Sequence, residues 1–155
     1  MVIISLIAAM PKKVFWNASA SVPIGLYLAT SPAKPGIGDI VVFDPPAEVA
    51  RFADSRGYLP LGTPMLKRVA GLAGDRICRR ETEVRVANVV LTARDRDRKG
   101  RPLPVWEGCR TLGRGEVFLL NVGVPDSLDG RYFGPQPIER VAAIAVPIWT
   151  FGSVR

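Results

Sequence analysis

Histidine is absent from this chain of 155 residues. Its absence excludes Ser-His-Asp and Cys-His catalysis, both of which need an imidazole base. Cysteine is scarce too, since Cys78 and Cys109 are the only two and lack the paired spacing of a zinc site. They form either one disulfide, which would suit an oxidising compartment, or two reduced core thiols. The sequence therefore predicts no metal and no cofactor.

The chain also lacks a hydrophobic run long enough to cross a membrane. Residues 2–10, VIISLIAAM, are apolar, whereas a membrane-spanning helix needs about 20 residues. No basic region precedes them, as it would in a secretory signal. Three interpretations stay open for residues 1–16: the remnant of an anchor that starts upstream of Met1, an apolar segment packed on the protein or in the membrane interface, or a first strand. Phe15 and Trp16 are core residues or an interfacial anchor, and we favour the core.

Long helices are not indicated either. Glycine and proline occur 15 and 14 times in a chain that is 48% hydrophobic, which favours a single, mainly β domain with short strands and turns. The charge of +7 suits an anionic membrane surface or a nucleic acid without choosing between them. The most basic stretch, residues 94–101 (RDRDRKGR), contains two aspartates and no aromatic residue to stack on bases. We interpret it as a solvated hairpin tip and expect no nucleic-acid partner.

A serine-containing stretch, residues 17–27 (NASASVPIGLY), stands out among the segments that are present. Ser19 and Ser21 are two residues apart, so they face the same side of an extended segment. Pro23 fixes its own φ and biases Val22 towards an extended conformation, while Gly25 tolerates close approaches. The pattern fits either a rigidly held, exposed serine or an ordinary serine-rich turn before a strand.

Several apolar runs predict strands. We expect them at residues 25–29, 40–43 and 115–121, with a hairpin over 82–92, and a last strand over 141–151 in which Pro147 marks a bulge or an edge. Residues 47–56 place Val49, Phe52 and Ala53 on one helical face, between Pro46 and Gly57. These residues predict a short surface helix.

Lys67 is the unusual residue of the next segment, residues 65–75 (MLKRVAGLAGD). Strand alternation puts it on the same face as Met65 and Val69. If that face is the core, desolvation lowers the pKa of the ammonium and leaves an amine able to accept a proton. If Leu66 is the core residue instead, Lys67 is a surface lysine. Periodicity alone leaves both interpretations open.

Four blocks in this order resemble the type I signal peptidases of the Ser-Lys class, and among them the conjugative-transfer, TraF-type peptidases. The blocks are SASVPIGLY, GDIVVF, MLKRVAGLAGD and DSLDGRYFG. The first is similar to the TraF-type form of the nucleophile motif, and the third and fourth resemble the blocks that carry the family's general-base lysine and its Ser-Asp-Arg pattern. The match runs from about residue 17 to residue 145.

The resemblance implies a role for each matching residue. Ser21 would be the nucleophile and Lys67 its general base, neutral because it is buried. Ser19 would donate to the oxyanion together with the backbone N–H of Ser21. Ser127 would orient the lysine amine.

Asp129 and Arg131, in the same block as Ser127, would pair beneath the lysine and fix the loop. The resemblance to the TraF-type branch implies that the aspartate would also matter directly for activity. The carboxylate suits the role of a third member that holds the base in place.

The family's fold implies a mainly β protein: a bent, largely antiparallel sheet structure with one or two short helices. Residues 17–155 would form the peptidase domain, with a small second lobe over about residues 78–110. The substrate, an exported precursor and above all the conjugative pilin precursor, would bind as an added strand. Cleavage would end in hydrolysis or in cyclisation. The resemblance places the catalytic domain on the outer, periplasmic face of the cytoplasmic membrane, in contact with the membrane surface and with conjugative type IV secretion components.

Three alternatives stay open at this point. A general signal peptidase would remove secretory signal peptides with the same dyad. A self-cleaving Ser-Lys repressor would need a DNA-binding domain or a built-in cleavage segment, and neither is visible in the sequence. A non-catalytic β module of the secretion apparatus would carry the dyad residues without using them.

Overall fold

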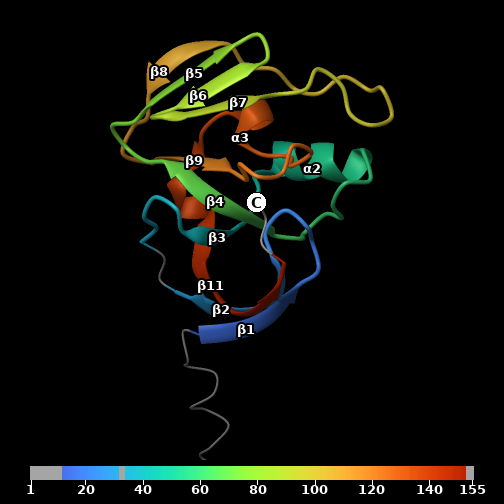
Figure 1. The fold of residues 1–155 in the computed structure, drawn as a ribbon, viewed down its shortest axis with the longest axis vertical. Helices are drawn as coiled ribbons and strands as arrows, with labels where there is room; N and C mark the ends of the chain where they lie inside the picture. The colour runs from blue at the N-terminus through green and yellow to red at the C-terminus, as the bar shows by residue number, and fades with distance from the viewer. Residues whose placement is uncertain (1–11, 32–33, 153–155) are drawn as a thin grey trace, which may run out of the picture.

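A computed structural model describes residues 12–31 and 34–152 of the chain. Within these residues the strands form two antiparallel sheets, one of seven strands and one of four (Figure 1). The larger sheet has the order β1-β2-β11-β3-β4-β9-β10 and the smaller one β7-β6-β5-β8. The expectation of a mainly β, largely antiparallel fold with one or two short helices is confirmed.

The larger sheet contains seven of the described strands. They are β1 (Lys12–Asn17), β2 (Ile24–Thr30), β3 (Ile40–Phe43), β4 (Met65–Gly71), β9 (Glu116–Leu120), β10 (Gln136–Pro137) and β11 (Val141–Phe151). The smaller sheet contains β5 (Arg76–Arg80), β6 (Glu83–Val86), β7 (Val89–Thr92) and β8 (Gly108–Thr111). The described helices are α2 (Ala47–Ser55), the single turn α3 (Gly130–Phe133) and the 3-10 turn η1 (Ile138–Arg140).

The long last strand, β11, pairs with both β2 and β3. Its register against β2 shifts between Pro147 and Trp149, which confirms the bulge or edge predicted at this proline. The bulge brings β11 very close to Gly25, where an added Cβ would lie 2.1 Å from the backbone oxygen of Trp149. Glycine is therefore required at this crossing.

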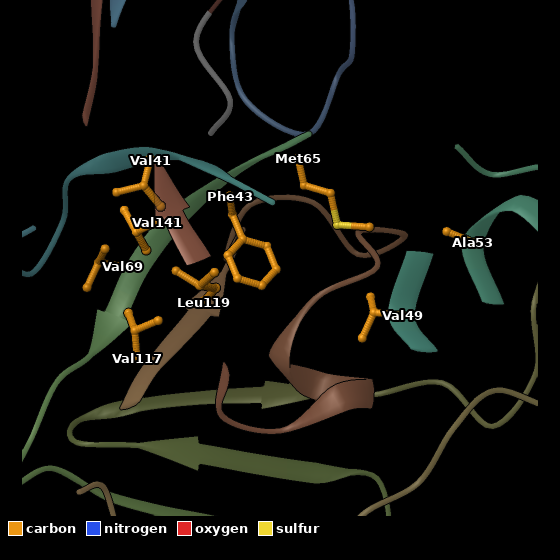
Figure 2. Close-up of a cluster of buried hydrophobic side chains, with 9 residues drawn as sticks. All are labelled: Val41, Phe43, Val49, Ala53, Met65, Val69, Val117, Leu119 and Val141. Atoms are coloured by element: carbon orange, nitrogen blue, oxygen red, sulfur yellow. The ribbon is translucent and has the colours of Figure 1, made fainter. Parts of the chain in front are cut away.

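One hydrophobic core lies between the larger sheet and α2. Nine buried side chains from β3, α2, β4, β9 and β11 form it (Figure 2). Val49 and Ala53 of α2 face this core, as the helical pattern predicts. The helix begins directly after Pro46, and Gly57, with a φ of 71°, follows its end.

The smaller sheet packs on the opposite face of β9, the face formed by Phe118 and Leu120. Ile77, Val84 and Val86 from this sheet share a buried cluster with Phe118 and Leu120. A disulfide joins Cys78 in β5 to Cys109 in β8, so the open question about the two cysteines is answered in favour of a bridge. The sheet spans residues 76–111, close to the bounds of about 78–110 that the sequence predicts for a small lobe. The division of the chain into domains stays a prediction.

The apolar run at residues 2–10 lies outside the described residues, and its three interpretations stay open. No helix in residues 12–31 and 34–152 is long and apolar enough to cross a membrane. In β1 the alternation of the strand sends Phe15 and Trp16 to opposite faces. Phe15 stacks on the buried Tyr27, but Trp16 is 51% exposed, so the expectation of a core position is wrong for Trp16.

Candidate active site

Lys67 lies in the middle of β4, between β3 and β9. Along this strand Met65, Lys67 and Val69 are buried, whereas Arg68 is exposed. Only 5% of Lys67 is accessible to solvent. Of the two interpretations that periodicity leaves open, the inward-facing one is therefore correct.

The environment of Lys67 favours a neutral amine. Burial lowers its pKa to about 8 from an ordinary value of 10.5, because desolvation penalises the ammonium. The carboxylate of Asp129 opposes this shift, and the guanidinium of Arg131 reinforces it. The Nζ atom donates a hydrogen bond of 2.9 Å to Oγ of Ser127. A fraction of the Lys67 side chains is thus unprotonated near neutral pH. The hydrogen bond to Ser127 fixes the direction in which the amine points.

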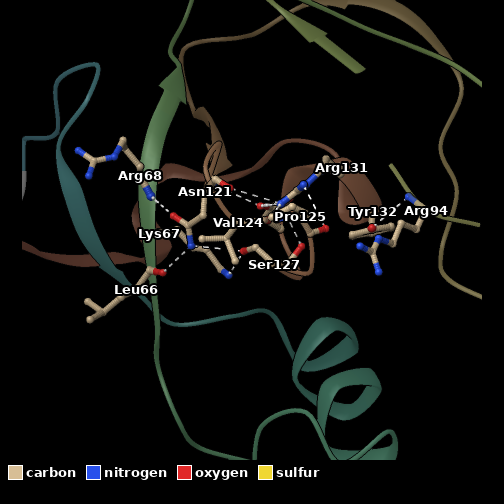
Figure 3. Close-up of polar contacts among 11 residues, drawn as sticks. Leu66, Lys67, Arg68, Arg94, Asn121, Val124, Pro125, Ser127, Arg131 and Tyr132 are labelled. Atoms are coloured by element: carbon tan, nitrogen blue, oxygen red, sulfur yellow. Dashed lines mark hydrogen bonds and ion pairs between the residues drawn. The ribbon is translucent and has the colours of Figure 1, made fainter. Parts of the chain in front are cut away.

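The loop that presents Ser127 is held by a buried ion pair. Nε and Nη2 of Arg131 donate to the two carboxylate oxygens of Asp129 at 2.9 and 2.8 Å. The same guanidinium donates to backbone oxygens of the loop, including Val124 at 2.7 Å and Ser127 at 3.3 Å (Figure 3). Asp129 and Arg131 are 5% and 1% exposed. These two residues fix the loop from behind Ser127.

Asn121, immediately after β9, is a site residue that the sequence analysis missed. Its side-chain amide donates to the backbone oxygen of Leu66 and to Oγ of Ser127, both at 3.3 Å. Its Oδ1 accepts the backbone N–H of Arg68 at 3.2 Å. Asn121 therefore bonds to the backbone on both sides of Lys67 (Figure 3). A polar residue directly after the apolar run VFLL is the one sequence signal that could have identified it.

The serine segment connects β1 to β2. Its centre is Asn17, a buried residue whose amide donates to Ser19, Val22 and Pro23 backbone oxygens at 2.9, 3.3 and 3.1 Å. Oγ of Ser19 and Oγ of Ser21 are 2.7 Å apart, so the two serines do face the same side. Asn17 is the second site residue without an assigned role in the sequence analysis.

A single cleft of about 1410 Å³ joins the two halves of the site. Ser19 and Ser21 line it from one side, and Lys67 and Ser127 from the other. Asp129 and Arg131 lie outside its lining, behind Ser127. In the described part of the chain no hydrogen bond joins Ser21 to Lys67: Oγ of Ser21 bonds to Oγ of Ser19, and Nζ of Lys67 bonds to Oγ of Ser127.

Residues 94–101 form a narrow, mostly exposed turn with a bridge between Arg96 and Pro102, which confirms the predicted solvated tip. The sequence did not predict that basic side chains of this turn also line the cleft. The reason is a set of long-range contacts. Asp97 accepts a hydrogen bond from Tyr58, which follows α2, and Arg94 pairs with Asp126 at 2.6 Å.

The described residues contain no cluster of His, Cys, Asp and Glu suited to a metal ion. The disulfide keeps both cysteines out of the cleft. What the cleft does contain is a neutralisable buried amine, two hydroxyl groups on the opposite wall and a third hydroxyl bound to the amine. Such a set supports proton transfer and nucleophilic attack by a serine.

Comparison with known proteins places the chain in a family. Residues 1–150 match the family model described as "Signal peptidase, peptidase S26", and the chain belongs to this peptidase family. Within it the chain is similar to TraF proteins. A plasmid transfer protein TraF of Escherichia coli is 35% identical over 147 residues, which cover 87% of this chain and 82% of that protein.

Two further similarities complete the comparison. A conjugal transfer protein TraF of Agrobacterium tumefaciens (strain 15955) is 33% identical over 157 residues, covering 87% of this chain and 81% of that protein. The crystal structure of a signal peptidase I from Enterococcus faecalis V583 is 22% identical, covers 74% of this chain and 98% of that chain, and has a TM-score of 0.42.

Proposed function

We propose that this chain is a serine endopeptidase of the signal peptidase type in which Ser21 is the nucleophile and Lys67 the general base. The observation that carries the proposal is the buried lysine, whose pKa is lowered to about 8 and which lies in one cleft with Ser21. A base with a pKa near the working pH combines a substantial unprotonated fraction with a useful affinity for the proton.

In the proposed reaction, neutral Lys67 accepts the hydroxyl proton of Ser21 as Oγ attacks the scissile carbonyl carbon. The tetrahedral intermediate collapses when the C–N bond breaks and Lys67 returns its proton to the departing amine. Water, or an amine of the substrate itself, then attacks the acyl-enzyme. The first route releases a linear product and the second closes a ring.

Ser19 is proposed to stabilise the oxyanion. Its hydroxyl lies 2.7 Å from Oγ of Ser21, and the backbone N–H of Ser21 would be the second donor. The removal of one such donor lowers the rate on the order of 10²–10³-fold in other hydrolases. To attack, Oγ of Ser21 must exchange its bond to Ser19 for one to Lys67, which a rotation of its side chain or a shift of the segment would achieve. Ser19 would then be free to bind the oxyanion.

The proposed substrate is an exported precursor, with the conjugative pilin precursor as the first candidate, because the relatives are named as plasmid and conjugal transfer proteins. The enzyme would then work beside conjugative type IV secretion components. An extended peptide suits a cleft bordered by strands.

We further propose that the domain contacts the membrane through an exposed aromatic cluster at β1 and β11. Trp16, Trp149 and Phe151 are 51%, 60% and 52% exposed, and their rings lie against one another. Indole rings favour the membrane interface, and the apolar residues 2–10 precede this cluster in the sequence. The catalytic domain would sit on the outer face of the cytoplasmic membrane. The test compares vesicle binding of a Trp149→Ser, Phe151→Ser variant with that of a control variant, Val90→Ser with Val105→Ser, at two other exposed positions. Equal binding by the two variants would exclude the aromatic cluster as the membrane contact.

The proposed activity is tested with a pilin-type precursor in detergent micelles or bilayers. Wild-type protein, Ser21→Ala and Lys67→Ala are compared by intact mass. We expect one defined product from wild type and none from either variant, and a product one water lighter than the linear peptide would identify cyclisation. Cleavage by both variants at the wild-type rate would contradict the assignment and favour a non-catalytic β module or another pair of residues.

A further inference from the structure

The cleft has one strongly basic wall that the proposed reaction does not use. Five of the residues between 94 and 101 are basic, and all five line the cleft together with Arg56. This turn lies beside α2, at the opposite end of the molecule from β1 and β2 (Figure 1). Trp16 of the exposed aromatic cluster also lines the cleft, whereas Trp149 and Phe151 do not.

Asp97 holds the turn in place from inside. Its carboxylate accepts from the backbone N–H groups of Lys99 and Arg101, both at 2.9 Å, and from Nε of Arg101 at 2.8 Å. Nη1 of Arg56 lies 3.7 Å from the same carboxylate. A charged wall that is already ordered loses little conformational entropy when a ligand binds.

The basic side chains of this wall outnumber the carboxylates that face it. Asp97 is shared by Arg56 and Arg101, and Asp126 is shared by Arg94 and Arg98. Among the described residues, Arg96 and Lys99 have no acidic partner. Arg96 donates instead to the backbone oxygen of Gly100 at 2.7 Å. Asp126 directly precedes Ser127, so its ion pairs connect this turn to the loop that binds the amine of the proposed base.

We propose that residues 94–101 select substrates with acidic residues on one flank of the scissile bond. The inference rests on the proposed function, because it concerns the occupant of the same cleft. An extended peptide in the cleft that Lys67 and this turn both line would have one flank at the turn, where its carboxylates would meet Arg96 and Lys99. Several partly exposed charge pairs together give about a tenfold preference.

An anionic membrane is the competing occupant of a basic surface, but its position argues against it. The basic turn lines the cleft beside α2, whereas Trp149 and Phe151, exposed aromatic side chains that suit a membrane interface, lie on β11 outside the cleft lining. A lipid surface in contact with β1 and β11 does not need the basic turn. A peptide in the cleft passes it.

The test measures binding separately from cleavage, so that its result does not depend on the proposed chemistry. Full-chain Ser21→Ala protein in zwitterionic micelles is titrated with fluorescent alanine-centred peptides that have glutamates on one flank or the other, and with matched glutamine peptides. The same titrations use a background variant with Arg96→Glu and Lys99→Glu. The matched control is Arg51→Glu with Arg80→Glu, two exposed residues outside the cleft that give the same change in net charge.

We expect one glutamate peptide to bind about tenfold more tightly than its glutamine match, and this ratio to fall close to one in the Arg96/Lys99 variant but not in the control. The preference should also vanish at about 1 M salt, where the screening length is about 3 Å. Equal binding of the paired peptides would overturn the proposal. So would a preference that survives the Arg96/Lys99 change. If the preference is found and wild type still cleaves nothing, the proposed function fails and the binding surface stands.

Discussion

The two halves of the site are built very differently. On the β4 side, Lys67 is buried and bonded to Ser127, which Asn121 and the Asp129–Arg131 pair hold from behind. On the opposite side, Ser19 is exposed and Ser21 half-buried, and their hydroxyl groups bond to each other.

This difference follows from what each group needs. A buried amine is costly unless its donors are satisfied, so its surroundings must be ordered before the substrate arrives. A serine hydroxyl can stay exposed to solvent without such a cost, and a bound substrate can orient it. We therefore expect the lysine half to contribute to the stability of the fold and the serine half to adjust when a substrate binds.

The largest effect is expected from breaking the ion pair of the lysine half. Asp129→Asn leaves the buried Arg131 guanidinium without its counter-charge, which should lower the free energy of unfolding by about 3–5 kcal/mol. Urea titration measures it. Asp126→Asn is the matched control, because Asp126 makes only exposed ion pairs and its loss should cost about 1 kcal/mol or less. Equal losses of unfolding free energy in the two variants would show that burial does not determine how much an ion pair contributes to stability.

A smaller effect of opposite sign is expected at Lys67. Below pH 8 the lysine is charged in both folded and unfolded states, so the folded state bears the cost of burying the charge. Lys67→Met should then raise the free energy of unfolding by about 2 kcal/mol at pH 7. This gain is smaller than the free energy that corresponds to the full pKa shift, because the hydrogen bond to Ser127 is lost.

This gain depends on pH in a defined direction. Between pH 8 and 10.5 the folded wild type loses the proton before the unfolded chain does, so wild type becomes more stable with rising pH and the advantage of Met shrinks. Urea titrations of both proteins at pH 7 and at several values above pH 8 measure the difference. An advantage that stays constant over this range would mean that Lys67 is not desolvated.

The smallest effect is expected in the serine half. Asn17→Ala removes the hydrogen bonds to three backbone oxygens and should lower kcat about tenfold with little change in KM, because the nucleophile is less well positioned. Precursor cleavage under single-turnover conditions measures it. Asn88→Ala, in the exposed turn between β6 and β7, serves as the control and should leave the rate unchanged. A fall in KM and kcat together would point to lost ground-state strain instead.

Much of this architecture could be predicted from local patterns. Continuous apolar runs give β3 and β9, and Pro46 and Gly57 bracket α2. The direction of Lys67 could not be predicted from periodicity, because Leu66 made the opposite face equally plausible. Only the three-dimensional pairing of β4 between β3 and β9 decides it.

The features missed from the sequence all depend on long-range contacts. Asn17 and Asn121 each end an apolar strand run, yet their partners follow from how the loops fold back. The sequence of residues 94–101, taken alone, predicts a surface turn. Its side chains line the cleft because Asp97 contacts Tyr58 and Arg56. Such contacts leave no periodic signal in the chain.

The central claim, that Lys67 is a pre-positioned base with a lowered pKa, is tested most directly by its own titration. The shift of the Cε resonance of Lys67 is followed by NMR against pH in lysine-labelled protein, with Lys67→Arg identifying the signal. The account predicts a pKa of about 8 and an ascending limb of kcat/KM at the same value. A pKa near 10.5 would contradict it, because the amine would then be fully charged in the range where the enzyme must work.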